Sequence, residues 1–318
     1  MLRLAIFAVL VCGAGVVASW SGSSVDDLSL RSVSTGAERK PPADIRINVD
    51  LKLIPVTVTD AHARAITGLQ KNNFKLFEDK TEQVITYFAS QDEPVSIGLL
   101  FDSSGSMGAK LSRSRTAVSE FLKVANPEDE FFLILFSDQA RLATDFTTNI
   151  DEIESRLALT ESKGKTAMFD AVHLALQEIK HARHSRKAIL IISDGGDNHS
   201  RYTSRRILSE LLEADVQIYS IGILEPLVRR NSLEIMSGPD LLDQIAQATG
   251  GRLFEADNPG DLREAASRIG TALRNQYLLG YMAGDNPVGR FRRLEVKIDR
   301  PKGFPPLRVS FPSGYYAR

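Results

Sequence analysis

VSIGLLFDSSGS, from Val95 to Ser106, is the stretch that decides the fold of this chain. An almost entirely apolar run ends at Asp102, hydroxyl side chains follow at alternating positions, and a helix-like segment comes next. A strand with so few polar residues is buried on both faces, which is typical of a parallel sheet covered by helices. The segment therefore predicts the start of an α/β domain, with polar side chains at a strand-to-helix turn.

Short apolar strands alternate with amphipathic runs along the following region. The expected strands are 97–101, 131–136, 188–192, 216–221 and 252–255. Apolar residues spaced as on one face of a helix occupy 117–125, 168–179, 207–212, 241–248 and 262–273. We therefore expect a doubly wound, Rossmann-like α/β domain over residues 95–275, with a mostly parallel sheet flanked by helices.

Segments rich in β-strand lie on both sides of this domain, at residues 44–94 and 276–318. Pro55 indicates an edge strand or a bulge, and the polar turn Asp79–Glu82 indicates a hairpin between the strands that flank it. Together the segments offer about seven strands, enough for one immunoglobulin-like sandwich. We therefore predict an α/β domain inserted into a small β-sandwich. The expected strands are 45–49, 51–58, 74–78, 84–88, 277–281, 291–298 and 307–311.

The amino terminus has the features of an export signal. Arg3 precedes an apolar core at 4–17, and the small residues up to Ala18 offer a cleavage site. We expect a signal peptide at residues 1–19 and a flexible leader at 20–43, with an uncleaved anchor as the alternative. The signal predicts an exported protein, either periplasmic or secreted.

Cysteine content and charge exclude several function classes. Cys12 is the only cysteine and lies inside the signal segment, so the mature chain would have no thiol for disulfides, zinc or catalysis. A formal net charge of -1 gives no overall attraction to nucleic acid or to an anionic membrane. We therefore expect no nucleic-acid partner and no membrane contact beyond the signal segment, and the oligomeric state stays open.

Oxygen-bearing side chains gather at the expected carboxyl edge of the sheet, where open α/β folds bind ligands. They follow apolar strands or begin helices, and they are Asp102, Ser104, Ser106, Thr166 and Asp194. Two carboxylates balance a divalent ion, and neutral hydroxyls leave it able to accept one more carboxylate, which suits Mg²⁺, or else Mn²⁺ or Ca²⁺. Without Thr166 and Asp194, the pattern Asp-x-Ser-x-Ser is more typical of a helix N-cap than of a metal site.

At these five positions the chain resembles the von Willebrand factor type A (VWA) domain. Each position matches one residue of that family's metal-ion-dependent adhesion site (MIDAS), and the resemblance covers Val95–Leu273. It implies a cation that coordinates an acidic residue of a partner protein. The flanks are similar to a bacterial exported subgroup described from acidobacteria, through VTVTD at 56–60, QYLLGY at 276–281 and PSGYY at 312–316.

Lys165 departs from the pattern of this family. It stands next to Thr166, where many relatives carry Gly. A positive charge in this place would weaken ion binding or would pair with Asp194.

Other interpretations of the same region have less support. Gly164-Lys165-Thr166 resembles part of a phosphate loop, but that motif requires Gly where Leu159 stands. No histidine lies near Ser104 in a catalytic pattern, and Asp197 and Asn198 are interpreted as a turn or helix cap. A zinc site lacks acidic or thiol partners at a suitable spacing from the candidate histidines, His173, His181 and His184.

The leading hypothesis is an exported, non-enzymatic binding module. Its MIDAS cation would receive an Asp or Glu carboxylate from a protein partner. The first alternative is a structural or interaction protein in which the site is empty or only braces loops. The second is a metal-assisted hydrolase, for which the sequence offers no general base apart from the ligands themselves.

Overall fold

The computed structural model describes residues 50–90, 93–223, 238–284 and 289–317. The predicted signal peptide, the leader and the first expected strand lie outside the described residues. Among the residues that are described, no helix is both long enough and apolar enough to span a lipid bilayer.

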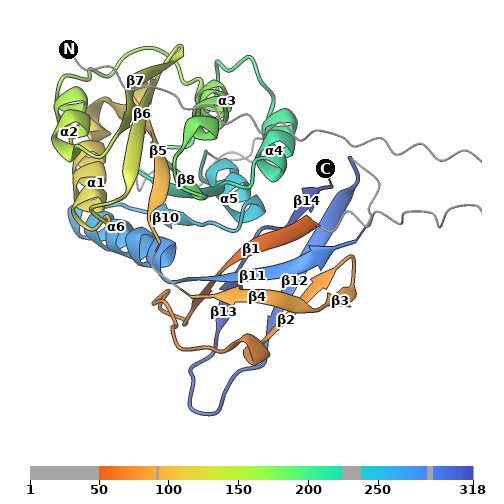
Figure 1. Cartoon of the computed structure of the whole chain (residues 1–318). Coiled ribbons are helices and arrows are strands. Elements are labelled where there is room, and N and C mark those ends of the chain that lie inside the picture. The colour runs from red at the N-terminus through yellow and green to blue at the C-terminus, as the bar shows by residue number, and fades with distance from the viewer. Residues whose placement is uncertain (1–49, 91–92, 224–237, 285–288, 318) are drawn as a thin grey trace, which may run out of the picture. The chain divides into compact units, whose positions relative to one another are not determined.

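A six-stranded sheet runs through the α/β part of the chain (Figure 1). Neighbouring strands are parallel except at one edge, where β7 runs antiparallel to β6. The strand order reverses between β5 and β8, so ligands are expected at the carboxyl ends of these two strands. In spatial order the strands are β10 (Leu253–Glu255), β9 (Gln217–Gly222), β8 (Arg186–Ser193), β5 (Val95–Asp102), β6 (Glu130–Phe136) and β7 (Ala140–Thr147).

Among the described residues, six α-helices cover the two faces of this sheet (Figure 1). One face packs against α1 (Leu111–Lys123), α2 (Ile150–Ala158) and α6 (Pro259–Arg274). The other packs against α3 (Met168–Glu178), α4 (Ser204–Glu213) and α5 (Gly238–Ala248). The predicted doubly wound α/β fold is therefore confirmed, although α2 and β7 were not expected from the sequence.

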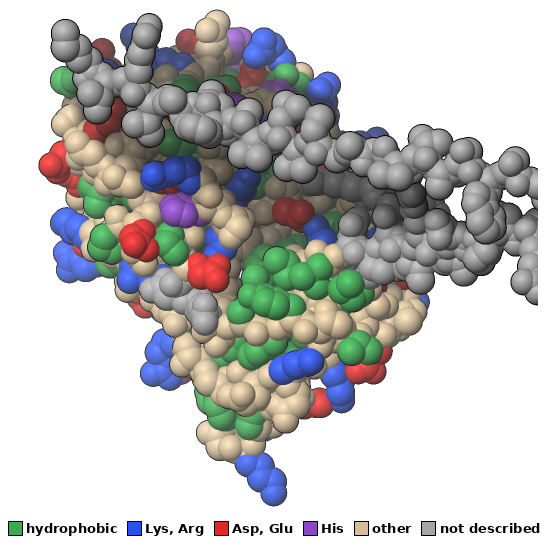
Figure 2. Space-filling model, viewed as in Figure 1, with side chains coloured by type: hydrophobic (Ala, Val, Ile, Leu, Met, Phe, Trp, Pro, Cys, Tyr) green, Lys and Arg blue, Asp and Glu red, His purple; other side chains and the backbone are tan. Residues whose placement is uncertain are grey.

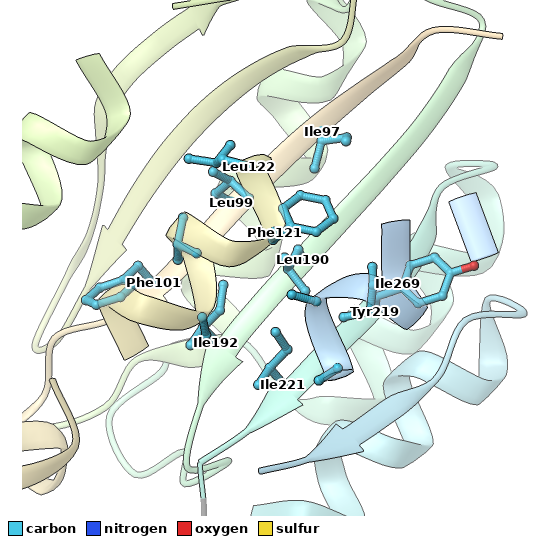
Figure 3. Close-up of a cluster of buried hydrophobic side chains, with 14 of the residues drawn as sticks. Ile97, Leu99, Phe101, Phe121, Leu122, Leu190, Ile192, Tyr219, Ile221 and Ile269 are labelled. Carbon is cyan, nitrogen blue, oxygen red and sulfur yellow. The ribbon is translucent and has the colours of Figure 1, made fainter. Parts of the chain in front are cut away.

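The central strand β5 is buried along its whole length, as its apolar sequence predicts. Ile97, Leu99 and Phe101 point to the face that α1 and α6 cover, where they belong to the same buried cluster as Phe121 (Figure 3). Leu100 points to the opposite face. The apolar residues from Ile97 to Phe101 thus join two separate cores through one strand, which holds its carboxyl end, Asp102, in a fixed place.

The Phe132 ring on β6 lies so close to position 98 of β5 that only glycine fits there. A Cβ atom at this position would lie 2.3 Å from Cζ of Phe132. The Phe132 ring fills the space that a side chain would need, so the sheet packs tightly here.

The remaining strands form a sandwich of two four-stranded sheets, and each sheet mixes strands from before and after the α/β part. The antiparallel pairs β1–β11 and β2–β12 join the two ends of the chain. The predicted sandwich is therefore confirmed. One sheet contains β13 (Arg308–Ser310), β1 (Asp50–Thr59), β11 (Gln276–Ala283) and β4 (Ile85–Ala89). The other contains β14 (Gly314–Tyr316), β12 (Phe291–Ile298), β2 (Phe74–Glu78) and β3 (Thr81–Gln83).

The predicted hairpin has a different partner from the one expected. β2 turns at Asp79 and Lys80, which both have positive φ, and pairs with β3, while β4 crosses to the other sheet and pairs with β11. Two consecutive residues with positive φ are typical of the tightest hairpin turns. Pro55 fits the edge prediction, because β13 pairs with β1 only at Thr57–Thr59, and no other described strand pairs with the Pro55 part of β1 on that side.

An apolar surface covers the outer face of the sheet that contains β1. Leu51, Leu53, Tyr87 and Met282 are exposed there, and the strand register puts them on the same face. Figure 2 shows apolar side chains gathered over this part of the sandwich.

Candidate functional site

Asp102 ends β5 and is fully buried. Its Oδ1 accepts a hydrogen bond from the backbone N–H of Ser104 at 2.9 Å, and its Oδ2 accepts one from the hydroxyl of Ser193 at 2.6 Å. Burial raises the pKa of Asp102 to about 6, and the negative charge of Asp194 adds to the rise. These hydrogen bonds oppose the rise without cancelling it, so Asp102 is a carboxylate held in place at an energetic cost.

Ser104 directly precedes a 3-10 helix, η2 (Gly105–Lys110), and Ser106 lies in its first turn. Their hydroxyl oxygens lie 3.1 Å apart. Ser104 occupies the N-cap position of η2, but its side chain makes no capping hydrogen bond. The helix-cap interpretation therefore does not account for Ser104, whose hydroxyl faces Ser106 instead.

Thr166 lies in a second loop that is bound to the first by backbone hydrogen bonds. Gly105 N–H donates to the carbonyl of Gly164 at 2.9 Å, and Lys163 N–H donates to the carbonyl of Ser103 at 2.8 Å. Gly164 itself has φ of +83°, a conformation that favours glycine. The two loops therefore hold the buried Thr166 in the same region as the serines.

A third loop, which follows β8, completes the arrangement. Asn198 receives a hydrogen bond from Thr166 N–H at its Oδ1, at 3.0 Å, and its own N–H donates to the carbonyl of Thr166 at 3.0 Å. Asp197 accepts hydrogen bonds from the backbone of His199 and Ser200, and burial raises its pKa. The predicted turn is therefore present, and Asn198 is a positioning residue for Thr166.

Asp194 follows β8 directly and is paired with a lysine that the sequence did not indicate. Lys110 Nζ lies 3.0 Å from Asp194 Oδ2, and both side chains are largely buried. Lys165, which the sequence suggested as the cation near Asp194, is exposed, and its backbone N–H donates to Asp138 Oδ1 at 2.8 Å. A lysine at the start of a helix is usually solvated, so only the tertiary structure reveals Lys110.

The chemistry of the donors fits a hard divalent cation. Carboxylate and hydroxyl oxygens come from three loops at the carboxyl edge of the sheet, beside the point where the strand order reverses. In the described part of the chain no cluster of three or more His, Cys, Asp or Glu side chains could hold a metal. The hydroxyls of Ser104, Ser106 and Thr166 are neutral oxygen donors that could supplement the two carboxylates at this edge.

Comparison with known proteins agrees with this architecture. Residues 97–196 match the family model of the von Willebrand factor type A domain. Human inter-alpha-trypsin inhibitor heavy chain H4 is 27% identical over 156 residues, which are 44% of this chain and 17% of that protein. An uncharacterized protein of Borreliella burgdorferi is 23% identical over 184 residues, 51% of this chain and 54% of that protein. The chain thus spans about half or less of the length of these two relatives.

One solved structure is similar over most of the chain. The von Willebrand factor type A protein from Catenulispora acidiphila aligns with a TM-score of 0.50 at 12% identity, and covers 84% of this chain and 72% of its own. At that identity the likeness concerns the fold alone. The α/β part of this chain has the fold of a von Willebrand factor type A domain, and residues 97–196 match that family in sequence.

Proposed function

We propose that this protein is an exported, non-enzymatic binding module that captures an acidic residue of a partner protein through a divalent cation. Asp102, Ser104, Ser106, Thr166 and Asp194 would hold the ion, with Mg²⁺ favoured over Mn²⁺ and Ca²⁺. The ion would supply an electrophilic position for the partner's carboxylate. The proposed export rests on the signal-like sequence at residues 1–19.

The observation that carries this proposal is the buried carboxylate of Asp102 next to two hydroxyls that face each other. A carboxylate in such a place is costly unless a positive charge accompanies it. The Ser104 and Ser106 oxygens, 3.1 Å apart, add neutral donors on the same side. This donor set suits an ion that keeps part of its positive charge available for an external ligand.

The non-enzymatic part of the proposal is supported by the contacts of two histidines, one in the loop that contacts Thr166 and one on the helix α3 that follows it. His199 contacts Thr166 through its backbone, and the ring of His173 pairs with Glu210 and stacks on Tyr202. Neither contact poises a histidine to take a proton from Ser104 or from a bound water.

One observation favours the structural alternative. The Lys110–Asp194 ion pair already gives one carboxylate a positive partner without any metal. In that case the site would brace three loops, and the sandwich would carry the interactions.

Calorimetric titration with Mg²⁺ and Mn²⁺ separates these hypotheses. We expect the parent protein to bind one ion, and the double variant S104A/S106A to lose the binding, because two donors are removed without any change in charge. S112A, at an exposed serine on α1, is the matched control and should bind like the parent. Equal binding by the double variant and the parent would contradict the proposed ligand set.

The partner is then sought by a pull-down with and without chelator, using envelope proteins of the source organism. Capture that depends on the cation and is lost in S104A/S106A is the expected result. Capture that is unchanged in excess chelator would count against the proposed function and in favour of the structural alternative.

A further inference from the structure

Lys110 is placed where a metal-binding loop would not be expected to carry a positive charge. It ends η2, four positions after Ser106, and its carbonyl accepts a hydrogen bond from Ser114 at 3.0 Å. Its side chain is only 9% exposed, and its ammonium lies 3.0 Å from Asp194 Oδ2. A lysine this deeply buried is retained only where it has a partner, and here the partner is a proposed ligand of the ion.

We propose that Lys110 is a built-in cation of the site, which weakens binding of the divalent ion and strengthens binding of an acidic ligand once the ion is present. The inference rests on the proposed function and names the residue that tunes it. Lys110 acts as a positioning residue, because it holds the Asp194 carboxylate and touches neither the partner nor a reacting atom.

The charges explain both effects. Asp102 and Asp194 together balance a divalent ion, so Lys110 leaves one positive charge in excess when the site is loaded. A carboxylate from the partner removes that excess. Without the ion, Lys110 neutralises part of the negative charge of the two carboxylates, so Asp102 and Asp194 repel each other less in the metal-free site.

The fixed geometry makes this charge effective. The Ser193 hydroxyl at the end of β8 donates a hydrogen bond to Asp102, and Asp194 is the next residue in the chain. The Lys110 ammonium, which pairs with Asp194, therefore acts at short range on the whole donor set. Even in a water-like dielectric, a unit charge about 5 Å from a divalent ion weakens its binding by more than about tenfold. An exposed lysine at the rim is screened by salt and has a much smaller effect.

Manganese affinity of single variants tests the inference. We expect K110M, which keeps the length of the buried stem, to bind Mn²⁺ more than about tenfold more tightly than the parent in calorimetry. K165M removes the same charge from the exposed neighbour of Thr166 and should stay within about twofold at physiological salt. K110Q also removes the charge but keeps a hydrogen-bond donor for Asp194. It should bind Mn²⁺ as tightly as K110M is expected to, and it serves as the test if the apolar side chain of K110M disturbs folding.

Acetate binding to the manganese-loaded protein gives a second readout. Water proton relaxation reports the loss of a Mn²⁺-bound water when a carboxylate enters the shell. We expect acetate to displace this water at lower concentration in the parent than in K110M, because the parent has the excess charge.

The outcomes separate this inference from the proposed function. Binding of Mn²⁺ with equal affinity by the parent, K110M and K110Q overturns the inference alone. Weaker binding by both Lys110 variants also overturns it, since Lys110 would then prepare Asp194 for the ion rather than oppose it. Failure of every protein to bind Mn²⁺ overturns the proposed function and the inference together.

Discussion

Replacing Asp102 by asparagine should stabilise the metal-free protein while it abolishes ion binding. The side chain is fully buried, and the shift of its pKa from 3.8 to about 6 corresponds to about 3 kcal/mol of unfavourable free energy when it is ionised. D102N removes the charge and keeps an acceptor for the Ser104 N–H. The serine hydroxyl at position 193 can rotate to accept a hydrogen bond from the new amide.

The direction of the pKa shift determines how the stability of the parent changes with pH. The pKa of Asp102 is higher in the folded than in the unfolded chain, so the folded protein holds this proton more tightly. The stabilisation that protonated Asp102 gives the folded protein is therefore lost as pH rises from about 4 to about 6, and it is absent at higher pH. The amide that replaces the Asp102 carboxyl in the variant does not ionise. The stability of D102N relative to the parent should therefore increase between about pH 4 and pH 6, and the two proteins should be equally stable below about pH 4.

Thermal unfolding in chelator measures the effect. At about 2–4 °C per kcal/mol for a protein of this size, D102N should melt up to roughly 6–12 °C above the parent at neutral pH. Mg²⁺ should raise the melting temperature of the parent and leave that of D102N unchanged. D145N, at an exposed aspartate of β7, is the control and should melt like the parent. A D102N protein that melts below the parent in chelator, or whose advantage is the same at pH 4 and pH 7, would refute the reasoning.

Three further predictions concern the rest of the fold and site. A chain cut after Asn275 loses β11, which lies between β1 and β4, so the N-terminal strands should unfold; dispersed NMR signals from residues 50–89 in this fragment would contradict the inserted arrangement. G98A should lower the free energy of unfolding in urea by about 1–3 kcal/mol because of the 2.3 Å approach to Phe132, and adding F132L should recover part of the loss. N198A leaves the buried Thr166 N–H without its side-chain acceptor and should weaken Mn²⁺ binding in calorimetry; unchanged affinity would show that Asn198 does not position the threonine.

Much of the α/β fold was predictable because its central strands are apolar at nearly every position. β7 escaped prediction because most of it is exposed or half-buried, and its strand conformation comes from pairing with β6. The crossing of β4 was equally hidden, since only Val84 separates it from β3 and sequence proximity suggested a hairpin. Local pattern therefore indicates which segments are strands, but not which strands they pair with.

The candidate site divides in the same way. The five candidate residues could be proposed from the sequence because each was expected to follow an apolar strand or to open a helix, and topology brings such positions to one edge. Lys110 was not visible, because its partner Asp194 is 84 positions away and nothing in its local sequence marks it as buried. The sequence pointed to Lys165 because it is adjacent to Thr166, whereas backbone geometry leaves that side chain in solvent.

The inserted arrangement also sets the order in which the chain can fold. β1 is the first described strand, yet it pairs with β11 and β13, and Leu69 bonds to Tyr277 across 208 positions. A ribosome therefore delivers every strand of the α/β sheet before β1 has a partner. The α/β sheet can form from contacts within its own span, whereas the sandwich closes across a long loop, so we expect it to form last and more slowly. Until that closure, β1 and β4 are unpaired strands, and this is the interval in which a chaperone would have most to protect.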